Sequence, residues 1–192
     1  MIHNNYFIVG LYLLILFFLI KIKAKEIIIH NEDENFFNLI NVINNNQNDN
    51  NELVIRLVDD YYNMTEQVYN IELSLMSNVS IVGNENGTVI DYNKERRGGF
   101  LIAYSRNKWD KFTFKNLIFE NYSTNGADLQ GIQIISVFSK VSNIQVSLEN
   151  CVFRNNDYRL FHALVTNNKI MNDKPQVIFK NCVFQYVNRY LK

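Results

Sequence analysis

The residues best suited to catalysis in this chain are an acidic pair, Asp59-Asp60, and a histidine, His162. Neighbouring carboxylates can act as general acid and base or can bind calcium. Adjacent strand residues point to opposite faces, however, so the favoured interpretation of Asp59-Asp60 is a polar turn that closes a strand. His162 stands between apolar residues in an expected strand, either in the core or on the outer face, and a non-catalytic role is favoured. We therefore predict no catalytic residue, no metal site and no cofactor.

Sugar recognition by an aromatic ring is a second kind of chemistry that the sequence allows. Trp109 is the only tryptophan, and Lys108, Asp110 and Lys111 surround it. An aromatic ring can stack on a sugar ring, although aromatic side chains also fill the interiors of folds. Trp109 is the candidate sugar contact.

The charge balance limits the partners. The 192 residues include 19 basic and 19 acidic side chains, so the formal net charge is zero. A dedicated nucleic-acid binder would carry a basic excess, so nucleic acid is excluded as a partner by bulk charge. The chain has 31 Asn but only seven Gly and one Pro, so its turns rely on Asn, which tolerates left-handed backbone.

An internal repeat organises the C-terminal half. Three segments share the pattern Φ-x-N-Φ-Φ-F-x-N, with Tyr at the last position of the third copy, and they lie 34 and 31 residues apart. Each copy predicts a short alternating strand, an Asn at a bend and a second short strand that ends in Phe. The copies are residues 114–121, 148–155 and 179–186.

Further apolar runs between the copies, at 100–105, 132–138 and 160–166, give each unit three strands. Such a unit cannot bury its apolar faces alone, so the units are expected to stack into a solenoid. The predicted fold is all-β, a right-handed parallel β-helix of about four coils. An antiparallel sandwich is the alternative, but it requires hairpin turns, and Asn86-Gly87 and Asn125-Gly126 are the only Asn-Gly pairs.

Other segments extend this pattern towards the N-terminus. Residues 34–43 have a broad apolar helical face, residues 53–58 are an expected first coil strand, and residues 77–84 followed by 87–91 read as an early coil. Together with the three Asn bends, these features make the chain resemble the pectin-lyase-like family of right-handed parallel β-helix proteins. The resemblance implies an N-terminal capping helix, so we divide the chain into a leader (1–24), the capping helix with an Asn-rich loop (25–51) and the coils (52–192).

The repeated Asn residues are Asn116, Asn150 and Asn181. An Asn at a tight bend tolerates unusual dihedral angles, and its amide can both donate and accept along a stack. We therefore expect a structural Asn ladder. The resemblance also implies enzyme motifs, and the chain has Asn31-x-Asp33, Asp59-Asp60 and Arg106-x-Lys108 but lacks the G-H-G motif of the galacturonan hydrolases.

Cys151 and Cys182 occupy the same repeat position, directly after the ladder Asn. In register they would stack about 4.8 Å apart, which suits a disulfide in distance but strains it in direction. A disulfide and a stacked pair of buried thiols both remain open.

The uncharged apolar run at 6–20 is shorter than a membrane-spanning helix and fits a secretory signal peptide. Lys21, Lys23 and Lys25 follow the run, so an uncleaved anchor, in either orientation, is the alternative. Four N-glycosylation sequons suit a secreted surface, but this composition alone yields about two, so the secretory prediction depends on the leader. They begin at Asn63, Asn78, Asn86 and Asn121.

The expected function is a secreted or cell-surface module without catalytic activity, which adheres to polysaccharide, cell-surface glycans or protein. The alternative is a polysaccharide lyase or glycoside hydrolase acting on pectin-like polymers, as an incomplete chain. Only six residues follow the third repeat, so the C-terminal end is expected to be uncapped. Open strand edges favour end-to-end self-association. Membrane contact is expected only through an uncleaved leader.

Overall fold

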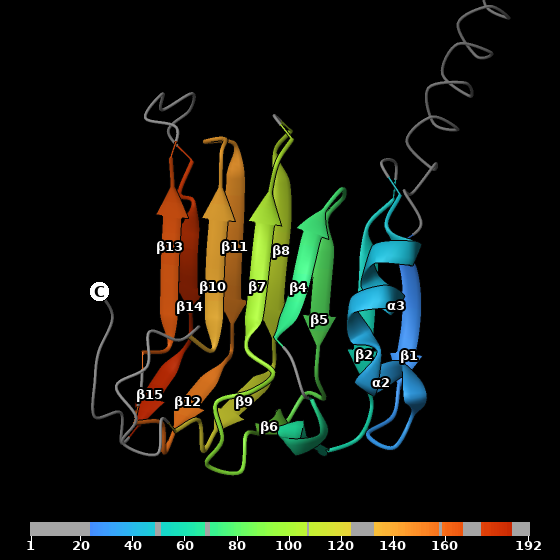
Figure 1. Cartoon of the computed structure of the whole chain (residues 1–192), viewed down its shortest axis with the longest axis vertical. Helices are drawn as coiled ribbons and strands as arrows, with labels where there is room; N and C mark the ends of the chain where they lie inside the picture. The colour runs from blue at the N-terminus through green and yellow to red at the C-terminus, as the bar shows by residue number, and fades with distance from the viewer. Residues whose placement is uncertain are drawn as a thin grey trace, which may run out of the picture.

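A parallel β-solenoid forms the body of the protein in the computed structural model (Figure 1). The structure describes residues 24–48, 51–67, 70–106, 108–123, 133–157, 159–166 and 174–185. Its strands form three parallel sheets of six, five and four strands, which we call sheets I, II and III. The arrangement confirms the predicted parallel β-helix and is not that of an antiparallel sandwich.

The chain visits the sheets in the order I, II, III and then returns to sheet I beside its earlier strand. Sheet I contains β1 (Lys25–Ile29), β2 (Leu53–Leu57), β5 (Val79–Val82), β8 (Asp110–Lys115), β11 (Ile144–Glu149) and β14 (Val177–Lys180). Sheet II contains β3 (Tyr61–Asn63), β6 (Thr88–Asp91), β9 (Leu117–Glu120), β12 (Val152–Arg154) and β15 (Val183–Gln185). Sheet III contains β4 (Ile71–Leu75), β7 (Phe100–Tyr104), β10 (Ile135–Ser139) and β13 (Phe161–Val165).

The solenoid has about five coils, one more than the repeat pattern predicted. The difference arises at the N-terminus, where β1 pairs in parallel with β2 across all five of its residues. The expected capping region, 25–51, therefore begins with a strand that the sequence pattern does not indicate. Residues 1–23, which include the predicted leader apart from Ala24, lie outside the described residues. Among those that are described, no helix is long and apolar enough to cross a membrane.

The predicted helix over 34–43 is present as two short helices, α2 (Glu34–Phe37) and α3 (Leu39–Asn46). Their buried residues are Phe36, Leu39 and Ile43. Helix α3 packs beside β4, where a further strand of sheet III would otherwise lie. Gln47, which ends α3, donates to the Ser74 carbonyl at 2.9 Å and accepts the Met76 N–H at 2.7 Å. The helical segment therefore covers an edge strand whose backbone groups would otherwise be open.

Stacked aromatic rings fill the core behind sheet II. The Phe at the sixth position of each repeat lies above its equivalent in the next coil, with ring centroids 5.0 Å apart for Phe119 and Phe153 and 5.2 Å apart for Phe153 and Phe184. The interplanar angles are 16° and 5°, so these rings are nearly parallel. Exact register between coils is what places equivalent side chains in contact.

The three repeated Asn residues form a ladder at the bend between sheets I and II. Their backbones are left-handed, with φ of 57° at Asn116, 54° at Asn150 and 54° at Asn181. The Asn150 amide donates to Asn116 Oδ1 at 3.1 Å, and the Asn181 amide donates to Asn150 Oδ1 at 3.2 Å. Asn is favoured here because it accepts positive φ and also supplies a donor and an acceptor.

Substitutions of Asn150, the central residue of this ladder, separate the contribution of its side-chain hydrogen bonds from that of its left-handed backbone. We expect Asn150→Leu to lower the free energy of unfolding by about 1–3 kcal/mol, because it loses two side-chain hydrogen bonds and strains a left-handed backbone. Asn150→Gly loses the same hydrogen bonds without the strain and should cost less. Urea unfolding followed by circular dichroism measures both, and equal losses for the two variants would contradict the role of the backbone.

Candidate functional site

A hollow opens on the surface where sheet I turns into sheet II near the N-terminal end. It has a volume of about 470 Å³ and is open to solvent. The turns between the two sheets are longer here than in later coils. Residues 58–60 connect β2 to β3, and residues 83–87 connect β5 to β6. By contrast, Asn116 alone connects β8 to β9. The residues that line the hollow are His30, Asn31, Glu32, Asp59, Asp60 and Tyr61.

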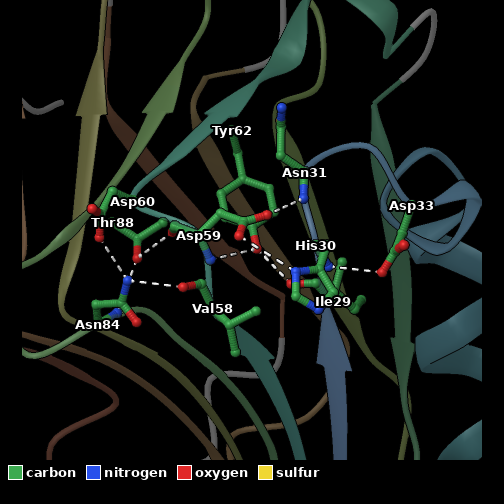
Figure 2. A network of polar contacts seen from close by, with 10 residues as sticks. All are labelled: Ile29, His30, Asn31, Asp33, Val58, Asp59, Asp60, Tyr62, Asn84 and Thr88. Carbon is green, nitrogen blue, oxygen red and sulfur yellow. Dashed lines mark hydrogen bonds and ion pairs between the residues drawn. The ribbon is translucent and has the colours of Figure 1, made fainter.

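Asp59 joins this turn to the coil before it (Figure 2). Its Oδ2 accepts the backbone N–H of Asn31 at 2.7 Å, and its Oδ1 lies 3.4 Å from Nδ1 of His30. The hydrogen bond from Asn31 is the main reason why the pKa of Asp59 lies below its ordinary value; burial opposes this effect and His30 adds to it. Asp59 is therefore ionised at neutral pH and serves as an acceptor within the turn.

A buried tyrosine, Tyr62, also hydrogen-bonds to this turn. Tyr62 donates its hydroxyl hydrogen to the Ile29 carbonyl at 2.5 Å and accepts the Asp59 N–H at 3.3 Å. Burial raises the pKa of Tyr62 to about 12, so the hydroxyl remains a donor at neutral pH. Asp33 accepts the His30 N–H at 2.9 Å, which fixes the loop that follows β1.

Asp60 bonds in the opposite direction, towards the following coil (Figure 2). The side-chain amide of Asn84 donates to Asp60 Oδ1 at 2.8 Å and also lies 3.1 Å from the Val58 carbonyl. Thr88 is fully buried next to this contact, and its hydroxyl donates to the Asp59 carbonyl at 3.2 Å. The two carboxylates therefore hold neighbouring coils together.

Tyr61 places an aromatic ring beside the hollow on the outer face of sheet II. The residue is 43% exposed, and its hydroxyl donates to Asp91 Oδ2 at 2.9 Å. Burial, with the Asp91 hydrogen bond, raises the pKa of Tyr61 to about 12. In register with Tyr61 are Val89 on β6 and then Ile118 on β9, so the ring begins an apolar stripe on this face.

The arrangement favours binding over acid–base catalysis. Asp59 accepts from the Asn31 backbone in the preceding coil and Asp60 accepts from the Asn84 side chain in the following coil, so each carboxylate already has a hydrogen-bond donor. Within the described residues, no group of three or more His, Cys, Asp and Glu side chains is arranged to hold a metal ion. An exposed ring beside carboxylate, imidazole and amide groups suits a ligand with an apolar face and many hydroxyls.

Trp109, the sugar contact predicted from the sequence, lies directly before β8 and is half-buried. Lys174 Nζ lies 5.4 Å from its ring centroid, so a cation already occupies one face of the ring. Tyr61 was missed because the sequence shows only an ordinary tyrosine after an acidic turn. Its place beside His30 and Glu32 depends on the pairing of β1 with β2, which no local pattern indicated.

The enzyme-like fragments do not meet in one site. Asn31 donates its backbone N–H to Asp59, whereas Asp33 accepts the backbone N–H of His30, so both are parts of the turn network (Figure 2). Arg106 instead binds the Asp110 carboxylate at 3.1 Å, at the bend from sheet III into sheet I. His162 lies on the outer face of sheet III, where its ring packs edge-on against Phe138 with centroids 5.9 Å apart.

The four sequons differ in their surroundings. Asn86 and Asn78 are exposed, although Asn78 Oδ1 accepts the Lys111 N–H at 2.9 Å. Asn63 Oδ1 accepts the Thr65 N–H at 3.0 Å. The Asn121 amide, which is the atom a glycan would modify, donates to Asp91 Oδ1 at 2.8 Å. Asn86 is therefore an exposed acceptor, whereas the Asn121 amide already holds a neighbouring coil.

Cys151 and Cys182 are free thiols in adjacent coils. This is the stacked pair, one of the two arrangements that the sequence left open. Cys151 is buried and Cys182 is half-buried. The hydrogen bond between the two thiols, together with burial, raises the pKa of Cys151 well above its ordinary value. The buried thiol therefore stays protonated and packs as a small apolar side chain.

No family model matches the sequence, and the searches of curated proteins and of solved structures find no match.

The contribution of Asp59 to stability is expected to depend on pH. Because the folded-state pKa is lowered from the ordinary value of 3.8, the stabilisation is present above that value and is lost as the pH falls through the folded-state pKa. Asp59→Asn should therefore melt below wild type at neutral pH, and the difference should shrink towards pH 3. Glu72→Gln removes an exposed carboxylate outside the network and is the control. A difference in melting temperature that stays constant across this range would contradict the assignment.

Proposed function

We propose that this protein is a non-catalytic adhesion module that binds carbohydrate through the hollow beside Tyr61. The observation that carries the proposal is the exposed Tyr61 ring at the edge of an open polar hollow. A pyranose ring has an apolar C–H face that can stack on an aromatic ring and hydroxyls that hydrogen-bond to carboxylates and amides. The polysaccharide or glycan would be recognised by stacking on Tyr61 and by hydrogen bonds to the polar groups of the hollow.

The carboxylates support binding without cleavage. Most glycoside hydrolases need two carboxyl groups that flank one glycosidic bond, with one acting as acid and the other as base or nucleophile. Asp59 and Asp60 are neighbours that bond to opposite coils, and Asp59 is kept ionised by its hydrogen bond from Asn31. Neither is placed as a proton donor to a bound sugar. A lyase or hydrolase acting on pectin-like polymers is the competing function, and the binding experiment separates the two.

We also propose that the chain is a distant relative of the pectin-lyase-like proteins. The proposal is supported by the order of elements, with a helical segment at the N-terminal end, parallel coils of three strands and a ladder of Asn116, Asn150 and Asn181 at one bend. Parallel β-solenoids also occur in other families, so the fold by itself does not identify the family.

A secreted or cell-surface location is proposed from the apolar leader and the sequons. If the protein enters the secretory pathway of a eukaryotic cell, Asn86 should carry glycan, because it lies exposed at the tip of the turn between β5 and β6. We expect Asn86→Gln to remove one glycan, measured as a drop in mass that enzymatic deglycosylation abolishes. Asn121→Gln is the matched comparison. It should lower the mass less than Asn86→Gln does, because the Asn121 amide is hydrogen-bonded to Asp91. Unchanged mass in Asn86→Gln would contradict the assignment.

Binding to a panel of immobilised plant and cell-surface glycans tests the function. We expect Tyr61→Ala to weaken binding about threefold to tenfold, the range for loss of one aromatic contact. Tyr61→Phe keeps the ring and should retain most of the affinity, while Trp109→Ala should have little effect.

Product analysis on the same glycans separates binding from cleavage. Release of oligosaccharides that is lost in Asp59→Asn would identify the enzyme instead. Equal affinity of Tyr61→Ala and wild type for the glycan would contradict the proposal that the sugar binds beside Tyr61.

A further inference from the structure

Sheet I begins and ends with strands that each have one neighbour among the described residues. In that part of the chain β1 pairs with β2 alone and β14 pairs with β11 alone, at opposite ends of the six-stranded sheet (Figure 1). All pairings between neighbouring strands of this sheet are parallel, so β1 and β14 run in the same direction. The β1 strand of a second copy could therefore pair in parallel with β14, just as each strand of sheet I pairs with the strand of the next coil.

The last described strands expose apolar side chains. Phe184 ends the stack of parallel rings and is 42% exposed, and Phe179 contacts it at 5.9 Å between centroids. Val183 on β15 and Leu164 on β13, the last described strands of sheets II and III, are 44% and 46% exposed. At the other end, Ile28 on β1 is 56% exposed and Phe37 on α2 is 42% exposed. Both ends therefore present apolar surface that a second copy would bury.

The charges at the two ends are complementary. The described C-terminal segment, 174–185, carries Lys174 and Lys180 and has no acidic residue. At the N-terminal end, residues 24–38 have one basic side chain besides His30, which is Lys25. The acidic residues of that segment are Glu26, Glu32, Asp33 and Glu34. Opposite charges favour contact between unlike ends, while contact between two C-terminal ends would bring like charges together.

The register predicts which side chains would meet. One outer column of sheet I runs from Ile28 through Arg56, Val82, Lys115 and Glu149 to Lys180. Adding β1 of a second copy next to β14 in this register places its Ile28 beside Lys180. Phe179 would meet Ile27, because each lies one position earlier on its strand.

From this geometry we propose that copies of this chain associate head to tail, with the N-terminal end of one solenoid on the C-terminal end of the next. The contact is heterologous, so it does not close on itself and leads to short filaments as the concentration rises. The strand contacts of this inference, at Ile28, Phe179 and Lys180, lie outside the hollow, and Glu32 is the one residue that the charge argument shares with it. Self-association and carbohydrate binding are therefore tested by different variants.

Two variants that each block one end test the proposal. Ile28→Lys puts a charge beside Lys180 of the neighbour, and Val183→Glu puts an acidic group towards the acidic N-terminal end; both positions are largely exposed. Phe138→Lys changes an exposed apolar residue on β10, away from both ends, and is the control. The full-length chain is purified from a eukaryotic host in mild detergent, and circular dichroism verifies that each variant is folded.

Sedimentation velocity across the micromolar range gives the readout. We expect wild type and Phe138→Lys to form species that grow beyond the dimer with concentration, and each end variant to remain monomeric alone. An equal mixture of the two end variants should form dimers and nothing larger, because each retains one competent end. A monomeric wild type, loss of association in Phe138→Lys, or dimers of either end variant alone would overturn the proposal.

Discussion

The register between successive coils is the constraint on which the rest of this structure depends. Parallel strands pair at a spacing of about 4.8 Å only if each coil returns the chain to the same position, so equivalent residues lie directly above one another. The left-handed Asn residues at 116, 150 and 181 make this return in a very short bend, and their amides hydrogen-bond along the stack. The aromatic column that includes Phe119 and Phe153 follows from the same register.

The candidate site occurs where this constraint is relaxed. In the early coils the bend between sheets I and II is several residues long, so polar groups must satisfy the backbone in place of the Asn ladder. Asp59 and Asp60 do this by bonding to the coils on either side. Together with Tyr61, these carboxylates also line the open hollow. The same side chains therefore stabilise the turn and form the surface on which the proposed ligand would bind.

Features set by local patterns in the sequence could be predicted, whereas features set by contacts between distant segments could not. The strands of the repeat could be located because they alternate over a few residues, and the bends could be located because Asn recurs at a fixed position. β1 could not, because three consecutive Ile residues next to an apolar leader show no alternation. The helix over 34–43 could be located but not its break, since Asn38 has a non-helical backbone and neither Gly nor Pro marks the position.

The amino-acid sequence by itself determined the parallel coil, its Asn bends and the stacked cysteines, because these are repeated locally and need only register to align. Tertiary structure alone decided that β1 begins the stack and that His30 lies near Asp59, 29 residues away. It also decided that the ring beside the hollow is Tyr61, while Trp109 lies against Lys174. The physical reason is that these contacts join segments from different coils, and their energies depend on surfaces that exist only after the strands have paired.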